Sequence, residues 1–217
     1  MLDENWEHLV YLDADLVGIT ATTASANRAY EIAATYRKRG IPVVMGGIHA
    51  SMRPDEALRY VDTVVIGEAE SAWRAVTEDF QLNRLRPIYH GESVSVNNAP
   101  WPRRDLFHRG YVFASVETSR GCPMDCDFCA VTAFNGHKYR RRPPDEVLAE
   151  RKAITHKLIL FVDDNIVGQG RESRDQALAI SKGMVKEKLN NLISTIFALR
   201  SNLNYRNVVL KNSIKVK

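Results

Sequence analysis

The chain has 217 residues, of which 45% are hydrophobic and 26% are charged, and its formal net charge is +4. This size and composition fit one large globular domain or two small ones. No apolar stretch approaches the roughly 20 residues needed to cross a bilayer, which excludes a membrane-spanning protein. The N-terminal residues show neither a basic nor an apolar signal-peptide region, so a cytoplasmic location is expected.

The positive charge is concentrated near the C-terminus, because Lys186 to Lys217 contains seven Lys or Arg residues and one Glu. That segment has no periodic basic stripe and no interleaved aromatic residues, which are the features that favour nucleic-acid binding. Nucleic acid is therefore not an expected partner.

The first 92 residues alternate between short apolar runs and helical patterns. Gly40 stands where a helix C-terminal cap belongs, and Ser71 is expected to cap a later helix. The predicted strands are 15–20, 42–45 and 63–66, and the predicted helices are 27–39, 54–60 and 71–80. This order predicts an α/β domain with a partial doubly wound, Rossmann-like parallel sheet over residues 1–92.

A proline- and asparagine-rich stretch at 93–110 is predicted to be an interdomain linker. A second unit should follow over 111–217, with strands at 111–117 and 158–162 and helices at 145–156 and 171–189. A loop from Gly121 to about Gly136 separates the first strand from the first helix. Just after this loop, the run Arg140 to Arg142 is expected to be a solvated turn more readily than a cover for a cofactor anion.

The three cysteines of the chain, Cys122, Cys126 and Cys129, lie within eight residues as C-x3-C-x2-C. An odd number packed this closely is a poor disulfide framework and a good metal-ligand cluster. Three thiolates would leave one iron of a four-iron cluster without a protein ligand, open to a substrate. A closed zinc site with His137 as fourth ligand is the alternative.

The segment from Thr118 to Cys129, with Phe128 in the aromatic position before the last cysteine, resembles the radical S-adenosylmethionine (radical SAM) family. The resemblance implies a 4Fe-4S cluster on the three cysteines, and S-adenosylmethionine bound to the open iron and cleaved reductively. It also implies that residues 111–217 begin a (βα)6 partial TIM barrel. By the same resemblance, Phe128 lies beside the adenine, and the residues that end the next strand face the methionyl ammonium: Asp163, Asp164 and Asn165.

The glycine-rich strand ends of the first unit, Gly46-Gly47 and Gly67-Glu68, resemble the cobalamin-binding-type domain that precedes the barrel in one radical SAM subgroup. The resemblance implies cobalamin as a third cofactor, lying across the strand ends near Thr20, Thr22, Gly46, Gly47 and Gly67. The D-x-H-x-x-G segment that supplies a cobalt ligand in many members is absent. His49 is expected to be a loop residue with a local hydrogen bond and not a substitute ligand.

Compared with that subgroup, the chain looks truncated at both ends, since it lacks a first strand and helix and carries only two or three barrel units. Exposed sheet edges and self-association through them are therefore expected. The leading hypothesis is a radical SAM module for C–H chemistry or cobalamin-dependent methyl transfer, served by an electron donor such as flavodoxin or ferredoxin. The alternative is a non-catalytic fragment that holds zinc or an idle iron-sulfur cluster.

Overall fold

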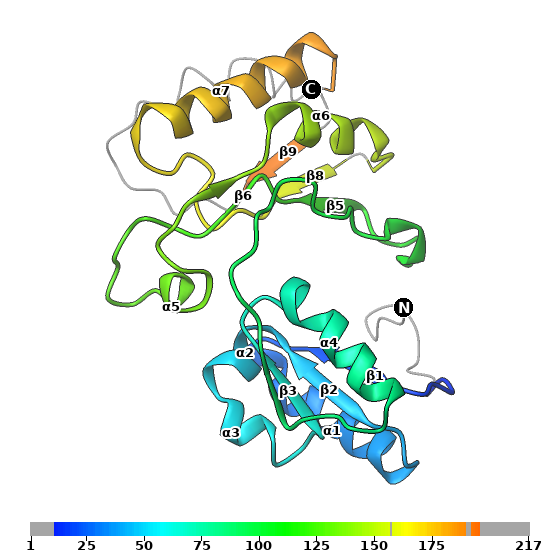
Figure 1. The fold of residues 1–217 in the computed structure, drawn as a ribbon. Helices are drawn as coiled ribbons and strands as arrows, with labels where there is room; N and C mark the ends of the chain where they lie inside the picture. The colour runs from blue at the N-terminus through cyan, green and yellow to red at the C-terminus, as the bar shows by residue number, and fades with distance from the viewer. Residues whose placement is uncertain (1–10, 157, 190–191, 196–217) are drawn as a thin grey trace. The chain divides into compact units, whose positions relative to one another are not determined.

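The computed structural model describes residues 11–156 and 158–189, and the backbone of 192–195. Most of the basic C-terminal segment lies outside these residues. The chain divides into two compact units (Figure 1). The N-terminal unit is Leu9–Val94 together with Phe128–Gly136, and the C-terminal unit is Ser95–Asp127 together with the described residues from His137 onward. Within the described part, no helix has the length and apolar character of a membrane span.

The N-terminal unit is built on a parallel sheet with the strand order β1-β2-β3-β4. Its strands are rich in valine and isoleucine, which suit a sheet covered on both faces. The bounds are β1 Val17–Thr20, β2 Val43–Gly46, β3 Thr63–Ile66 and β4 Ile88–His90. The register pairs Val17 with Val43 and Val64 with Ile88.

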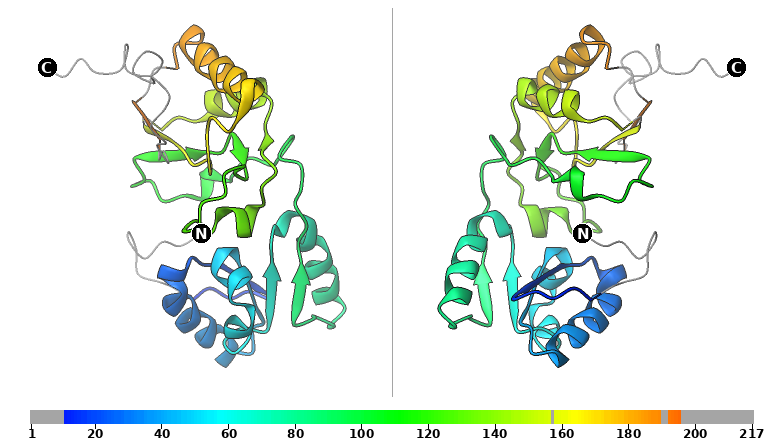
Figure 2. Two further views of the ribbon diagram at one scale, coloured as in Figure 1. Left: turned by 90° about the vertical axis from the view of Figure 1, so that its left-hand side faces the viewer. Right: turned by 90° about the vertical axis from the view of Figure 1, so that its right-hand side faces the viewer.

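Helices cover both faces of this sheet, as Figure 2 shows. Val43 and Met45 pack among α1, α2 and α3, whereas Val44 and Val65 pack against α4 on the other face. The helices are η1 Thr23–Ser25, α1 Ala26–Lys38, α2 Gly47–Met52, α3 Pro54–Ala57, α4 Ala69–Gln81 and α5 Val131–Asn135. The predicted Rossmann-like α/β class is confirmed. Each connection leads to the next strand in the same direction across the sheet. Because α1 and α4 lie on opposite faces, the crossover from β3 through α4 to β4 has the opposite handedness to the crossover from β1 through α1 to β2.

The C-terminal unit contains a second parallel sheet with the order β5-β8-β9, and a short antiparallel hairpin of β6 and β7. Ala114, Val116, Ile159 and Phe161 form its core with α6 and α7. The bounds are η2 Arg104–Leu106, β5 Phe113–Val116, β6 Ser119–Arg120, β7 Arg140–Arg141, α6 Pro144–Ala153, β8 Leu158–Phe161, α7 Gly170–Lys186 and β9 Leu192–Thr195. The alternation of strand and helix is the one expected for the opening units of a barrel.

One local expectation was wrong, and two short elements were not predicted. Helix α4 begins at Ala69, so Ser71 lies inside it and does not cap it. Its Oγ donates to the carbonyl of Glu68 at 3.1 Å and accepts from the backbone N–H of Glu92 at 2.7 Å. Ser71 thus ties the segment after β4 to the helix instead of satisfying the helix's own N–H groups. The helix α2 and the strand β4 were not predicted, because both are too short to show a period.

Candidate functional site

The carboxyl ends of β5 and β8 are neighbours, because the two strands pair in parallel with Val116 opposite Phe161. The segment leading to the first cysteine follows β5, and Asp163-Asp164-Asn165 follows β8. Residues more than forty positions apart in the sequence therefore meet at one edge of the sheet. This is where ligands bind in open α/β sheets.

Asp163 holds the backbone that leaves β5. Its Oδ1 accepts hydrogen bonds from the N–H of Thr118 at 2.7 Å, from the hydroxyls of Thr118 and Ser119 at 3.0 Å each, and from the N–H of Ser119. The side chain is only 9% exposed. Burial raises its pKa to about 6, although the hydrogen bonds from Thr118 and Ser119 favour the charged form. Its Oδ2 is buried without a hydrogen-bond partner among the described residues.

The next two residues continue along the same loop. Asp164 Oδ2 accepts the N–H of Gly121 at 2.8 Å. Asn165 Oδ1 accepts the N–H of Gly168 at 3.0 Å and that of Val167 at 3.3 Å, which fixes the orientation of its amide. Its Nδ2 lies 3.7 Å from Cys122 Sγ. Three consecutive side chains thus hold the chain up to and including the first cysteine.

All three cysteines are free thiols and partly exposed. Cys122 and Cys126 belong to the C-terminal unit, and Cys129 lies in the segment Phe128–Gly136 that groups with the N-terminal unit. Across the described residues, no three His, Cys, Asp or Glu side chains are arranged as a metal site, so cluster ligation stays a prediction. The donor set fits a cluster in its chemistry, since it offers three unpaired thiols and an amide N–H directed at one of them.

Phe128 and His137, which the sequence analysis also singled out, are both exposed. Phe128 is 92% exposed, and its place beside the adenine stays a prediction. Met124 Sδ contacts Gln169 Nε2 at 2.7 Å, which attaches the loop to the start of α7. His137, the fourth ligand of the zinc alternative, is exposed.

Tyr139 is a residue of this region that sequence reasoning missed. Its hydroxyl is buried without a hydrogen-bond partner among the described residues, and burial raises its pKa to about 12. Gly168 has a φ of +59°, and a Cβ there would lie 2.6 Å from the Tyr139 ring. Only glycine lets the ring pack so closely. The ring also lines a cavity of about 510 Å³ at the start of α7, together with Arg141 and Ser173.

The arginine run is not a solvated turn, because Arg140 and Arg142 are only 8% and 5% exposed. Arg142 Nη1 lies 2.5 Å from Glu150 Oε2 and donates to the carbonyl of Glu117 at 2.8 Å. Arg104 Nη2 lies 2.5 Å from the other oxygen of Glu150. One buried carboxylate on α6 therefore pairs with two arginines and fixes residues before β5 and after β7 to the unit.

The residues predicted to meet cobalamin lie at the carboxyl edge of the N-terminal sheet. Thr20 and Gly46 end β1 and β2 and are paired in register, and the Thr20 and Thr22 side chains are exposed. Gly47 has a φ of +89°, and a Cβ there would lie 2.5 Å from Thr20 Oγ1. A Cβ on Gly67, with a φ of +84°, would lie 2.4 Å from a backbone oxygen. Both positions therefore require glycine. Without side chains there, the edge of the sheet leaves room for a large flat cofactor beside the hydroxyls of Thr20 and Thr22.

His49 is buried within this unit, at 3% exposure, and lies in α2 instead of the expected loop. Its Nε2 lies 2.7 Å from Tyr30 Oη and 3.5 Å from Glu56 Oε1. Its Nδ1 lies 3.4 Å from Thr23 Oγ1. Both ring nitrogens are thus engaged within the protein, which accords with a structural histidine and not with a cobalt ligand.

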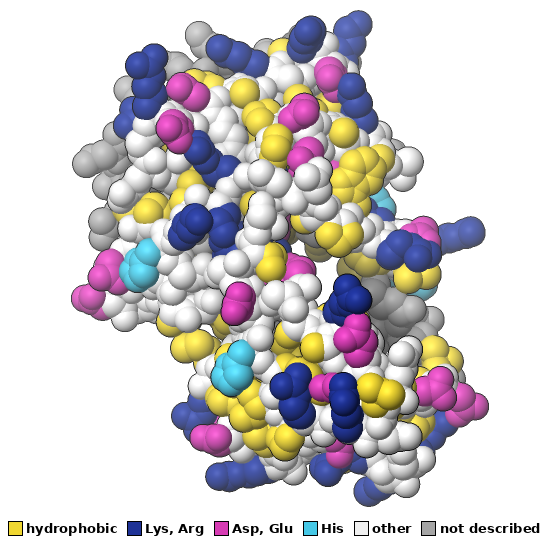
Figure 3. Space-filling model, viewed as in Figure 1, with side chains coloured by type: hydrophobic (Ala, Val, Ile, Leu, Met, Phe, Trp, Pro, Cys, Tyr) yellow, Lys and Arg dark blue, Asp and Glu magenta, His cyan; other side chains and the backbone are white. Residues whose placement is uncertain are grey.

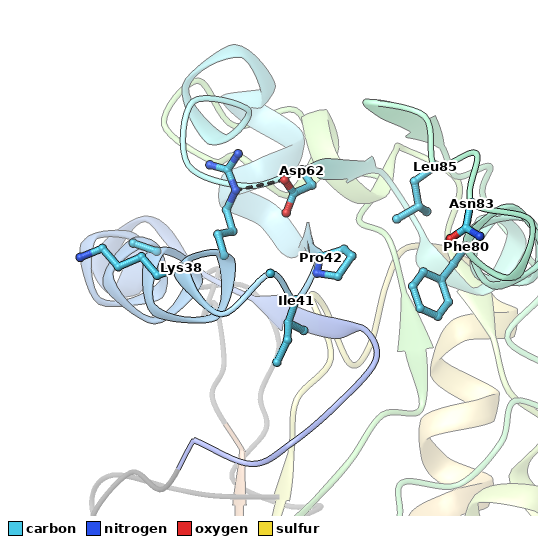
Figure 4. Close-up of a pocket in the computed structure, with 10 residues that line it drawn as sticks. Lys38, Ile41, Pro42, Asp62, Phe80, Asn83 and Leu85 are labelled. Atoms are coloured by element: carbon cyan, nitrogen blue, oxygen red, sulfur yellow. Dashed lines mark hydrogen bonds and ion pairs between the residues drawn. The ribbon is translucent and has the colours of Figure 1, made fainter.

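A cavity of about 790 Å³ lies at the opposite end of the same sheet (Figure 4). It is lined by residues that precede β2 and β3, including Pro42 and Asp62, and by Phe80. Asp62 accepts hydrogen bonds from Arg37 Nε at 3.0 Å and from the N–H of Val43 at 2.9 Å, so its carboxylate is already paired within the protein. Because sites in parallel sheets form at the carboxyl ends of strands, this cavity is not the candidate site.

Comparisons with known proteins bear on both units. Residues 4–77 match the B12 binding domain family. The chain is 32% identical over 212 residues to bacteriochlorophyllide d C-8(2)-methyltransferase of Chlorobaculum tepidum, covering 88% of this chain and 45% of that protein. It is 24% identical over 171 residues to hopanoid C-2 methylase of Rhodopseudomonas palustris, covering 75% of this chain and 32% of that protein. The chain therefore spans less than half the length of these curated relatives.

Solved structures with the same fold include two radical SAM proteins. TsrM of Kitasatospora setae, a radical S-adenosylmethionine methyltransferase, aligns with a TM-score of 0.62 and 18% identity over 82% of this chain and 41% of that chain. OxsB, a cobalamin-dependent S-adenosylmethionine radical enzyme, aligns with a TM-score of 0.61 and 17% identity over 79% of this chain and 29% of that chain. The predicted resemblance to the radical SAM subgroup with an N-terminal cobalamin-binding-type domain is confirmed.

Proposed function

We propose that this chain is the cofactor-binding part of a cobalamin-dependent radical SAM methyltransferase. In this proposal the N-terminal unit binds cobalamin at the carboxyl ends of β1, β2 and β3. The cysteine loop binds a 4Fe-4S cluster through Cys122, Cys126 and Cys129, and S-adenosylmethionine next to Phe128. Methyl transfer is favoured over other radical chemistry because the relatives that match along the chain are named methyltransferases and methylases.

The observation that carries the proposal is the attachment of the cysteine loop to the neighbouring strand. Asp163, Asp164 and Asn165 each bond a different part of residues 118–122. A loop that served only as a surface connection would not need a nearly buried carboxylate with four donors on one oxygen. The anchoring places Cys122 at the carboxyl edge of a parallel sheet, where a cofactor can bind.

When bound, a 4Fe-4S cluster would supply the one electron that reductive cleavage of S-adenosylmethionine needs. The protein's own residues would hold the partners for this step. The three thiolates would grip the cluster and leave one iron open. The exposed ring of Phe128 would stack on the adenine, and the loop held by Asp163 would keep the cysteines in place.

For cobalamin, the residues at the strand ends would provide space and hydrogen bonds and no ligand to the cobalt. The glycines at positions 46, 47 and 67 would let the cofactor approach the backbone, and the hydroxyls of Thr20 and Thr22 would donate to its polar groups. His49 is committed to Tyr30 and Thr23, so we expect no histidine from this segment on the cobalt.

On the face shown in Figure 3, the described residues give no support to a nucleic-acid partner. Figure 3 shows Lys and Arg side chains interspersed with Asp and Glu over the visible face, without a continuous basic stripe. Charge of mixed sign does not provide the electrostatic footprint of phosphate-backbone binding.

The test is anaerobic reconstitution of the full chain with iron and sulfide. We expect a brown protein with about four irons per chain. After reduction with dithionite, it should release 5′-deoxyadenosine and methionine in equal amounts from S-adenosylmethionine. A variant with all three cysteines replaced by alanine should stay colourless and release neither. Colourless wild-type protein with one zinc would refute the proposal in favour of a metal-binding fragment.

Cobalamin binding is tested separately by equilibrium dialysis against aquacobalamin, since it does not depend on the cluster. We expect saturable binding at one site per chain, weakened by bulky replacements at Gly46 on the edge. No binding to wild type would leave a radical SAM protein without the methyl carrier.

A further inference from the structure

We propose that Asn165 is a positioning residue for the cluster, which donates a hydrogen bond from its side-chain amide to the sulfur of Cys122 and raises the reduction potential of the cluster held there. This inference rests on the proposed function, because it concerns the same three cysteines. It assigns Asn165 a role toward the cluster and not toward the methionyl ammonium of S-adenosylmethionine.

The orientation of the Asn165 amide follows from its hydrogen bonds. Asn165 Oδ1 accepts two backbone N–H groups, those of Gly168 at 3.0 Å and Val167 at 3.3 Å. A backbone N–H cannot accept a hydrogen bond, so the oxygen must face this turn and the NH₂ group must face the other way. That group lies 3.7 Å from Cys122 Sγ, within hydrogen-bond range for sulfur. The donor is fixed by the fold of the turn.

The segment that carries the acceptor, Cys122, is also held in place. Asp164 Oδ2 bonds the N–H of Gly121, the residue before Cys122, at 2.8 Å. Asp163 fixes Thr118 and Ser119 through a single, nearly buried oxygen. Donor and acceptor therefore sit on two segments that are bonded to each other at several points, which keeps the amide-to-sulfur contact in place.

A hydrogen bond to a ligating sulfur affects the two oxidation states of a cluster differently. A thiolate that ligates iron gains negative charge when the cluster is reduced. An N–H donated to that sulfur stabilises the reduced state more than the oxidised one, which raises the potential. By contrast, the carboxylates of Asp163 and Asp164 are already bonded to the loop, so the segment acts on the cluster through the cysteine loop.

The experiment compares wild type with Asn165→Asp and Asn165→Ala after anaerobic reconstitution of the full chain. Asn165→Asp keeps an oxygen for Val167 and Gly168 and loses only the N–H donor. Asn165→Ala loses the donor without adding charge. Asn97→Asp, at an exposed position before β5, is the matched control for the added charge. The measurements are iron content and the midpoint potential from a redox titration followed by electron paramagnetic resonance.

We expect both Asn165 variants to bind iron and to titrate at a more negative potential than wild type, while Asn97→Asp titrates with wild type. Electron–nuclear double resonance of the reduced wild-type protein should show an exchangeable proton coupling that both variants lack. Brown variants with the wild-type potential overturn this inference and leave the proposed function standing. A shift seen only in Asn165→Asp and removed by salt also overturns it, since charge would explain it. Colourless wild-type protein overturns both.

Discussion

Replacing Asp163 by asparagine tests the account of the candidate site through stability alone. The carboxyl is 9% exposed and its pKa is raised to about 6 by burial, against an ordinary value of about 3.9 in an unfolded chain. The folded protein therefore holds this proton more tightly than the unfolded chain does. This tighter proton binding stabilises the folded state fully below about pH 4, and the stabilisation is lost as the pH rises through about 6.

The shift of about two pKa units corresponds to about 3 kcal/mol at pH 7.5, of which about 1 kcal/mol is already lost at pH 4.5. Asparagine cannot ionise, and its Oδ1 still accepts from Thr118 and Ser119. We therefore expect the stability of Asp163→Asn relative to wild type to rise by about 2 kcal/mol between pH 4.5 and pH 7.5. Any fixed cost of the new NH₂ group cancels in this difference.

The assay is urea unfolding followed by circular dichroism at both pH values, with hydrogen exchange in peptides of β5 and β8 to assign the transition to the C-terminal unit. Asp175→Asn removes a carboxylate that is 64% exposed on α7 of the same unit and should keep the wild-type pH profile. If Asp163→Asn keeps the wild-type pH profile too, burial does not raise the pKa of this carboxyl in the folded protein.

Three further predictions, one of them with a control substitution, test other parts of the structure. Glu150→Gln leaves the buried Arg142 and the partly buried Arg104 without their carboxylate and should lower the free energy of unfolding of the C-terminal unit by about 3–5 kcal/mol in urea titrations; a loss below about 1 kcal/mol would contradict the charge network around Glu150. Gly47→Ala forces a φ of +89° and a clash with Thr20, so it should cost about 1–3 kcal/mol in thermal unfolding. Gly46→Ala, whose Cβ would meet nothing closer than 3.8 Å, should cost clearly less, and equal losses would refute the conformational explanation. Tyr30→Phe removes the hydroxyl 2.7 Å from His49 Nε2 and should cost about 1–3 kcal/mol by the same measurement, whereas an unchanged midpoint would show that water replaces it.

The sequence by itself determined the features that depend on neighbouring residues. Runs such as Val43–Met45 and Thr63–Ile66 are apolar and β-branched, and such runs form buried strands in almost any fold with this alternation. Gly40 was expected to end a helix and has a φ of +76°, which the absence of a Cβ makes easy. The cysteine spacing was also readable directly, because ligand chemistry depends on residue type and short-range spacing.

Features that depend on distant partners were decided only by the tertiary structure. Nothing in the sequence around Arg142 marks it as buried, because its burial is tolerable only where Glu150 and Arg104 complete the charge network. The sequence around His49 likewise gives no sign of its burial. Only the tertiary structure brings Tyr30 and Thr23 within hydrogen-bond distance of its two ring nitrogens.

The candidate site shows the same division. The residue types in Asp163-Asp164-Asn165 and their place at a strand end could be predicted from the sequence. Their contacts could not, because Asp163 reaches Thr118 across 45 positions and only the parallel pairing of β5 with β8 brings the two together. Local chemistry is fixed by covalent neighbours, whereas the partner of a polar side chain is fixed by which strands lie side by side.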